Sequence, residues 1–225
     1  MSAVILILLV VDQSKGQSIF LHGIDNSLLR RKQFEETKGS VYLNELWSLG
    51  TLISKEGNEY SGLLLRYDAY QDVVEVNSEG QIFIASADDF PAFSLSISEP
   101  GTNTIKKHYF SSGYNLVGFN ELNYVELLAQ GKVDLIAKDK IDLLEDNIGK
   151  YGTPGSYRSY QARRFYFVMD TRGTSLAIKL SKKSILEIFP KNAVEIEAFL
   201  KKKKMKIKSE TDLIEVINYL NESVL

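Results

Sequence analysis

Residues 49–85 read LGTLISKEGNEYSGLLLRYDAYQDVVEVNSEGQIFIA, and this stretch decides the class of fold. Short apolar segments alternate in it with groups of turn residues, a pattern typical of β-strands joined by tight connections. The apolar segments are Leu49–Ser54, Tyr60–Tyr67, Val73–Asn77 and Ile82–Ala85. The connections KEGN, DAYQ and SEGQ are too short for the crossover that parallel strands need, so neighbouring strands must be antiparallel. The stretch therefore predicts an antiparallel β-meander.

Alternation along Val73–Asn77 predicts which side chains are buried. Val74 and Val76 are expected to face the core, and Glu75 and Asn77 to face water, because successive residues of a strand point to opposite faces. The strand-and-turn pattern continues to Glu145. It includes a hairpin in which Gly131-Lys132 joins Tyr124–Gln130 to Val133–Lys138.

The last third of the chain changes from strands to helices. A second hairpin is predicted from Phe165–Met169 and Leu176–Leu180, followed by helices over Lys182–Phe189 and Ala193–Lys203. Ser209 is a suitable N-cap for a last helix. The apolar residues of that helix recur at i, i+3, i+4 and i+7, which requires a buried face: Leu213, Val216, Ile217 and Leu220. The expected fold is mainly β (α+β), an antiparallel β-meander followed by a C-terminal hairpin capped by two or three helices.

The first sixteen residues, MSAVILILLVVDQSKG, resemble a secretory signal. The apolar run Ala3–Val11 is shorter than the roughly 20 residues that span a bilayer. Ser14 and Gly16 place small side chains before a cut at Gln17. A buried first strand would produce the same apolar run. The expected organisation is a signal peptide at 1–16, a β-rich domain at 17–145, a linker or long loop at 146–160, and a hairpin with helices at 161–225.

Composition excludes several classes of chemistry. The chain has no cysteine, which excludes disulfides, thiol catalysis and thiolate metal sites. Its net charge of -2 offers no reason to expect a nucleic-acid partner. No segment after the leader approaches 18 apolar residues, so the mature chain is expected to have no integral membrane segment and to be soluble, in the periplasm or secreted.

No motif identifies a catalytic, cofactor or metal site, and none of these is predicted. His22 and His108 are far apart and lack metal-ligand spacing, so they are interpreted as solvated or structural histidines. Asp88-Asp89 is interpreted as a turn before Pro91, because adjacent carboxylates on a strand diverge. Asp142, Glu145 and Asp146 lack the alternating ligand spacing of a calcium loop, and a charged sheet end is expected there.

Two sets of residues could form binding surfaces. The lysine run Lys201–Lys204, followed by Lys206 and Lys208, could bind anions, but a solvated helix end is the favoured interpretation because the helix dipole attracts cations there. Tyrosine rings are apolar with a polar tip and suit a glycan or protein partner. The candidates for such a surface are Tyr67, Tyr70, Tyr109, Tyr114, Tyr157 and Tyr160, although tyrosine is equally common on sheets and a structural role is the favoured interpretation. The tyrosines assigned to the surface are Tyr67, Tyr70, Tyr157 and Tyr160.

Residues 17–225 resemble a family of uncharacterised exported proteins of Bacteroidetes-type Gram-negative bacteria. The segments that carry this resemblance are YLNELW at Tyr42–Trp47, GTLISKEGNEY from Gly50, LRYDAYQD from Leu65 and KIKSETDLIEVINYLN from Lys206. The resemblance implies a location and a general shape, and it transfers no active-site residue.

Three functions remain open from the sequence. The first is an exported envelope protein, non-catalytic, that binds an unknown envelope protein or glycan or has a structural role. The second is a hydrolase of envelope or extracellular polymers that uses carboxylates. The third is a carrier that holds an apolar ligand. A concave cluster of titratable groups would favour the hydrolase, and a flat surface would favour binding.

Overall fold

The strands form one large sheet, which positions every polar cluster discussed below. The computed structural model describes residues 22–23, 37–99, 101–147 and 156–223. The predicted signal peptide at 1–16 lies outside these residues. The strands in the described part of the chain are β1 (His22–Gly23), β2 (Thr37–Lys38), β3 (Ser48–Ile53), β4 (Glu59–Asp68), β5 (Val73–Ser78), β6 (Gln81–Ala85), β7 (Ala92–Ser98), β8 (Ile105–Ser111), β9 (Val125–Ala129), β10 (Val133–Asn147), β11 (Ser156–Asp170) and β12 (Ser175–Ile178).

The order of the strands confirms the predicted antiparallel sheet. Eleven strands follow one another in the order β1-β6-β5-β4-β3-β7-β8-β9-β10-β11-β12. All neighbours along this path are antiparallel, and the short β2 pairs beside it with β11 in the parallel direction. From β3 to β12 the simple meander is interrupted once, where β7 follows β6 in the chain but pairs with β3. Two meanders are thus joined through β3 and β7.

Local turn chemistry explains the meander that the sequence predicted. Between β5 and β6, Glu79 and Gly80 both have positive φ, of 53° and 84°. This is the geometry of the two-residue turns that match the twist of a hairpin. In β4, Gly62 has a φ of 75°, and the register between β3 and β4 shifts beside it. A glycine supplies that conformation without steric cost.

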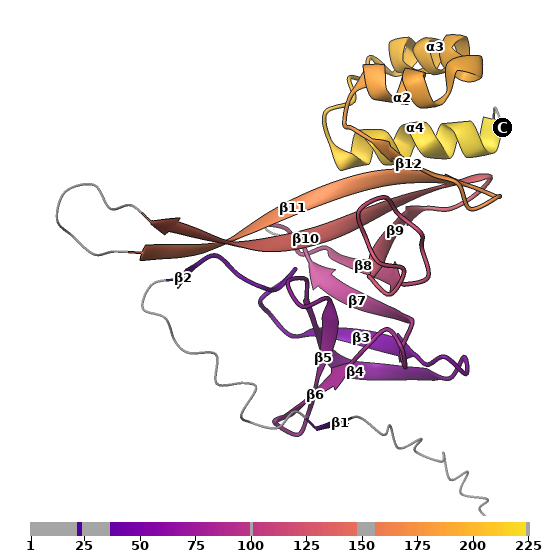
Figure 1. The fold of residues 1–225 in the computed structure, drawn as a ribbon. Helices are drawn as coiled ribbons and strands as arrows, with labels where there is room; N and C mark the ends of the chain where they lie inside the picture. The colour runs from indigo at the N-terminus through magenta and orange to yellow at the C-terminus, as the bar shows by residue number, and fades with distance from the viewer. Residues whose placement is uncertain (1–21, 24–36, 100, 148–155, 224–225) are drawn as a thin grey trace, which may run out of the picture.

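The longest elements are β10 and β11, which pair from Val133–Asp170 to Asn147–Ser156. Figure 1 shows their hairpin running under the helices and then projecting past the other strands. Both strands extend into the segment 146–160 that the sequence assigned to a linker. β10 and β11 therefore join the residues before and after the segment 146–160 into one sheet.

An aromatic cluster lies in the core that residues of β3 to β8 and β10 form. Phe93 and Phe110 stack with centroids 4.5 Å apart, and the rings of Tyr67 and Tyr124 meet them at an angle. All four residues are at most 2% exposed. Such aromatic contacts stabilise the core beyond their burial of apolar area.

The strand β5 confirms the expected burial of its valines and corrects that of Glu75. Val74 and Val76 are buried, but Glu75 is also only 3% exposed. Its carboxylate lies 2.6 Å from the guanidinium of Arg66, the cross-strand neighbour on β4, and accepts a hydrogen bond from the Tyr42 hydroxyl. Alternation alone predicts on which face of the sheet the Glu75 side chain lies. The ion pair with the cross-strand Arg66 allows the carboxylate to be buried on that face.

The C-terminal segment forms a helical cap on one end of the sheet, as predicted (Figure 1). The cap contains α2 (Lys182–Ile188), the short 3-10 helix η1 (Pro190–Asn192), α3 (Ala193–Lys203) and α4 (Glu210–Ser223). Ser181 caps α2 by accepting from the Ser184 amide, and Ser209 does the same for the Asp212 amide at the start of α4. Among the described residues, no helix is both long enough and apolar enough to cross a membrane.

The helix α4 joins the cap to the sheet. The four predicted apolar residues, Leu213, Val216, Ile217 and Leu220, are fully buried against β9, β10 and the other helices. Near its C-terminal end, the side chain of Asn221 donates to the Val133 carbonyl at 2.9 Å and accepts from the Val133 amide at 3.0 Å. The side-chain amide of Asn221 thereby satisfies both backbone groups of Val133, the first residue of β10.

We predict that Leu213→Asp or Ile217→Asp lowers the free energy of unfolding by about 2–4 kcal/mol, because each places an unpaired charge in the core. Chemical denaturation measures the loss. Asn218→Asp adds the same charge on the exposed side of α4 and is expected to change the stability little. Equal stability of all three variants would show that this face of α4 is not packed.

Candidate functional site

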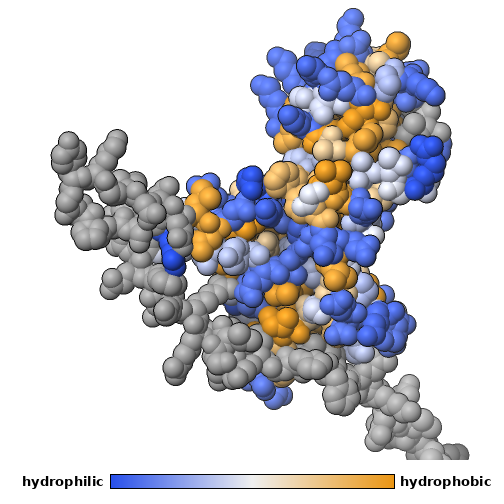
Figure 2. All heavy atoms as spheres, viewed as in Figure 1, coloured by the Kyte–Doolittle hydropathy of each residue, from blue (hydrophilic) through white to orange (hydrophobic). Residues whose placement is uncertain are grey.

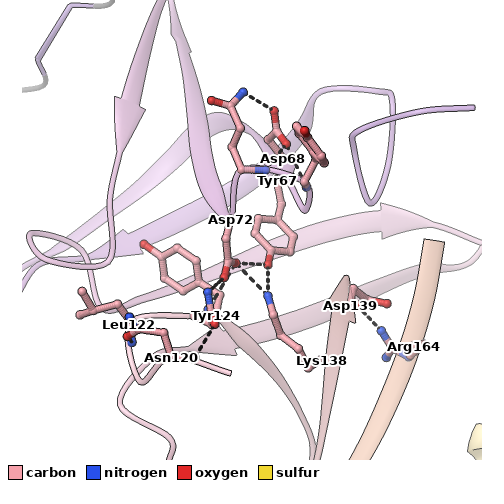
Figure 3. Close-up of polar contacts among 12 residues, drawn as sticks. Tyr67, Asp68, Asp72, Asn120, Leu122, Tyr124, Lys138, Asp139 and Arg164 are labelled. Carbon is pink, nitrogen blue, oxygen red and sulfur yellow. Dashed lines mark hydrogen bonds and ion pairs between the residues drawn. The ribbon is translucent and has the colours of Figure 1, made fainter. Parts of the chain in front are cut away.

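Two groups of buried and half-buried charged side chains include neighbouring residues of β10, Lys138 and Asp139. In the first, the Lys138 ammonium is 3% exposed and lies 2.9 Å from Asp72 and 3.0 Å from the Tyr67 hydroxyl (Figure 3). Tyr67 donates its own hydroxyl proton to Asp72. Asp72 accepts a further hydrogen bond from the Asn123 amide. This cluster ties the turn between β4 and β5 to the long strand β10.

The second group is centred on Arg164 of β11. Its guanidinium binds Glu126 of β9, Asp139 of β10 and Glu210 of α4, the last at 2.6 Å. Glu126 also contacts His108 of β8, whose Nδ1 lies 2.6 Å from its carboxylate. One cation therefore connects three strands and the first turn of α4.

Strand register explains this convergence. Asp139 and Arg164 are direct cross-strand partners, and Glu126 lies opposite Ala137. Lys138 and Asp139 are adjacent in β10 and point to opposite faces. Figure 3 shows Lys138 directed toward Asp72 and Asp139 directed toward Arg164. The two clusters thus share one strand but lie on different sides of it.

Burial and charge shift the pKa values in these clusters in different directions. Burial raises the pKa of the Tyr67 hydroxyl well above its usual range, and the Asp72 carboxylate raises it further. Burial lowers the pKa of Lys138, although the charge of Asp72 opposes this effect. Burial also raises the pKa of Asp139, despite its ion pair with Arg164. For Glu126, burial would raise the pKa, but His108 and Arg164 outweigh it and hold the pKa below its ordinary value.

Perturbed pKa values are typical of active sites, but ion-pair networks also produce them. Here the geometry favours a structural network. The Arg164 guanidinium occupies the space between its three carboxylates, and Lys138 is almost inaccessible to solvent. No group of three or more histidine or acidic side chains suited to a metal ion occurs in the part of the chain that the structure describes.

Of the tyrosines assigned to a binding surface, Tyr67 lies in the core and Tyr70 is exposed to solvent. Tyr67 is 1% exposed and belongs to the core, so its assignment to a surface is wrong. Tyr70 is 44% exposed, and its ring lies 5.3 Å from that of Tyr160. The side chain of Tyr157 lies outside the described part of the structure. Two of the four tyrosines therefore form a pair.

The other residues considered from the sequence lie apart from the charged clusters. Asp88 and Asp89 are exposed in a turn, as predicted, and Asp89 pairs with Lys55 at 3.2 Å. Asp142 binds Arg163 and Lys140, which agrees with a charged part of the sheet. The side chains of His22, Glu145 and Asp146 lie outside the described residues.

The lysine run lies at the C-terminal end of α3 and in the segment that follows it, as the sequence indicated. Four lysines of the run, Lys201, Lys204, Lys206 and Lys208, also line a hollow in the helical cap, which the sequence did not suggest. The central role of Arg164 was also missed. One feature of the sequence could have predicted these charged clusters. Glu126 and Lys138 lie within otherwise apolar strands, and a charge in such a position needs a buried partner.

The chain matches no family model, no curated protein and no solved structure in comparisons with known proteins. The function must therefore be argued from the residues of the chain itself.

We predict that Arg164→Met lowers the free energy of unfolding by about 3–5 kcal/mol, because it leaves three carboxylates without their common cation. Urea denaturation measures the effect. Arg163→Met is the matched control on the neighbouring residue. Arg163 is largely exposed and pairs with Asp142 alone among the described carboxylates, so its loss should cost about 1 kcal/mol or less. Similar losses in the two variants would contradict a central role for Arg164.

Proposed function

We propose that the chain is an exported protein of the Gram-negative cell envelope that binds an envelope glycan or protein without catalysing a reaction. The observation that carries this proposal is the ring contact between Tyr70, which is exposed in the turn after β4, and the half-buried Tyr160 of β11. Export rests on the predicted leader and on the family resemblance of the sequence.

The tyrosine pair has features of a binding surface. Tyr160 belongs to β11 and lies directly opposite Leu143 on β10, so an apolar side chain adjoins the pair. Tyr160 packs partly against the aromatic core, which holds its ring in place, while Tyr70 is more open to solvent. Aromatic rings with wet hydroxyl tips contribute contact area at a low entropic cost.

The position of the pair also favours a partner that lies along the sheet. The pair lies near the start of β11, close to β2, which pairs with Arg158 and Ser159. This is the region where the long hairpin leaves the rest of the sheet (Figure 1). A partner could contact Tyr70 and the projecting strands together.

The ion pairs and the packing of the helices make the hydrolase and the apolar-ligand carrier less suitable as functions. A carboxylate hydrolase needs two carboxyl groups that are accessible across a substrate. Glu126, Asp139 and Glu210 instead bind Arg164, and Asp72 binds Lys138. A carrier that holds its ligand between the helices and the sheet would need space there, but the apolar side chains of α4 pack fully buried against the sheet.

Expression of the full chain in a Gram-negative host, followed by fractionation and sedimentation, tests the proposal. The protein should leave the cytoplasm and begin at Gln17 by mass spectrometry. The purified product should sediment with isolated cell walls or with envelope vesicles, which distinguishes a glycan of the wall from a membrane protein. Tyr70→Ala/Tyr160→Ala should weaken binding by about fivefold or more, as the loss of about 1 kcal/mol at an interface implies.

Tyr109→Ala is the matched control for this experiment. Tyr109 is 50% exposed on β8 and is not part of the tyrosine pair. Its removal should leave the binding unchanged. Binding by the double variant at the level of the unchanged protein would refute the tyrosine surface, and a cytoplasmic product that retains Met1 would refute export.

A further inference from the structure

A hollow of about 540 Å³ lies in the helical cap, where α3 ends and the chain turns toward α4. Leu200, Met205 and Ile207 supply its apolar lining, and Ser181 and Lys182 border it from the start of α2. Leu200 and Ile207 are buried side chains of the cap core. The volume lies within the range of about 300–1,000 Å³ that is typical of small-molecule sites.

The polar lining of the hollow is almost entirely cationic. Its lysines are Lys182, Lys201, Lys204, Lys206 and Lys208. Glu197 is the acidic residue of the lining, and it forms an ion pair with Lys182 at 2.6 Å. The ammonium groups of the other four lysines form no ion pair with a carboxylate of the residues that the structure describes, although the backbone amide of Lys208 donates to Asp212. This local excess of positive charge contrasts with the net charge of -2 of the whole chain.

The helix dipole does not account for this arrangement. It favours cations in the last turn of α3, which includes Lys201. Lys206 and Lys208 come after the helix has ended, so they gain less from the dipole. Lys204 adopts a left-handed conformation, with a φ of 52°, at a position where glycine is usual. A solvated helix end therefore explains part of the lysine run only.

The combination of ammonium groups and apolar lining indicates the ligand chemistry. Charge-assisted hydrogen bonds from lysines suit a phosphate or carboxylate group. The apolar side chains, with the methylene stems of the lysines, suit hydrocarbon. Figure 2 shows hydrophilic residues, in blue, bordering apolar residues, in orange, on the helical cap. An inorganic anion would use the ammonium groups but not the apolar lining.

We propose that this hollow binds an amphiphile with an anionic head, phosphate or carboxylate, and an apolar chain that lies against Leu200, Met205 and Ile207. This site lies in the helical cap, on residues separate from the tyrosine pair, so either site can be wrong while the other stands. The lysines bind the head, and the burial of the chain supplies affinity that an inorganic anion lacks.

Methyl NMR with methionine labelled at the methyl carbon tests the proposal directly. The chain has three methionines, of which Met205 lines the hollow and Met169 packs in a different core cluster. Decyl phosphate, added below its micelle concentration, should shift the Met205 signal saturably and leave Met169 unchanged. Inorganic phosphate and decanol should each bind at least about tenfold more weakly, because each offers only one of the two features.

Two double variants with the same change of charge test the lysines. Lys206→Gln/Lys208→Gln should weaken decyl phosphate binding by about tenfold or more. Lys191→Gln/Lys202→Gln changes two exposed lysines of the same cap that do not line the hollow, and should leave binding unchanged. An unchanged Met169 signal and melting temperature show that each variant is folded.

Three results would overturn the proposal: no Met205 response to decyl phosphate, equal weakening by both double variants, or equally tight binding of decanol or inorganic phosphate. Vesicles distinguish two sources of the ligand. Sedimentation with phosphatidylglycerol but not phosphatidylcholine vesicles would support a membrane lipid as the source. Binding of the monomeric amphiphile without vesicle binding would support a free ligand.

Discussion

The ion pair between Arg164 and Glu210 fixes the start of α4 to the sheet, beside the buried apolar face of the helix. The Arg164 side chain satisfies three carboxylates that come from β9, β10 and α4. Removing charges from water is costly, and the cost is recovered only when the geometry satisfies every partner. Here cross-strand register supplies that geometry, since Asp139 lies directly opposite Arg164. At the other end of α4, Asn221 binds the backbone of Val133, so polar contacts hold both ends of a helix whose middle is apolar.

Most of the fold was predictable because it follows from local patterns. Turns such as Glu79-Gly80 and the apolar spacing of Leu213 and Ile217 are encoded by neighbouring residues, and both predictions are confirmed. The pairing of β7 with β3 and the full length of β10 and β11 were not predictable in this way. They depend on contacts between residues far apart in the chain, and the polar composition after Asp146 indicated a loop.

The charged clusters were hidden from the sequence for a related reason. Glu126, Arg164 and Glu210 are separated by long stretches of chain and match no motif, so only the assembled sheet reveals their contact. The exposure of the tyrosines was not predictable, because composition cannot tell the buried Tyr67 from the exposed Tyr70. The ion pairs at the junction of sheet and cap use other residues than the two proposed binding sites, the tyrosine pair and the lysine-lined hollow.

Native-state hydrogen exchange tests most directly the claim that the sheet and the helical cap form one cooperative unit. We expect the most protected amides of α4 to exchange with the same opening free energy as those in the middle of β10 and β11, because α4 cannot leave without breaking the Arg164–Glu210 ion pair and exposing its apolar face. Exchange of α2, α3 and α4 at a clearly lower free energy, with β10 and β11 still protected, would contradict this claim. The cap would then be a separately unfolding unit, and Arg164 would not join it to the sheet.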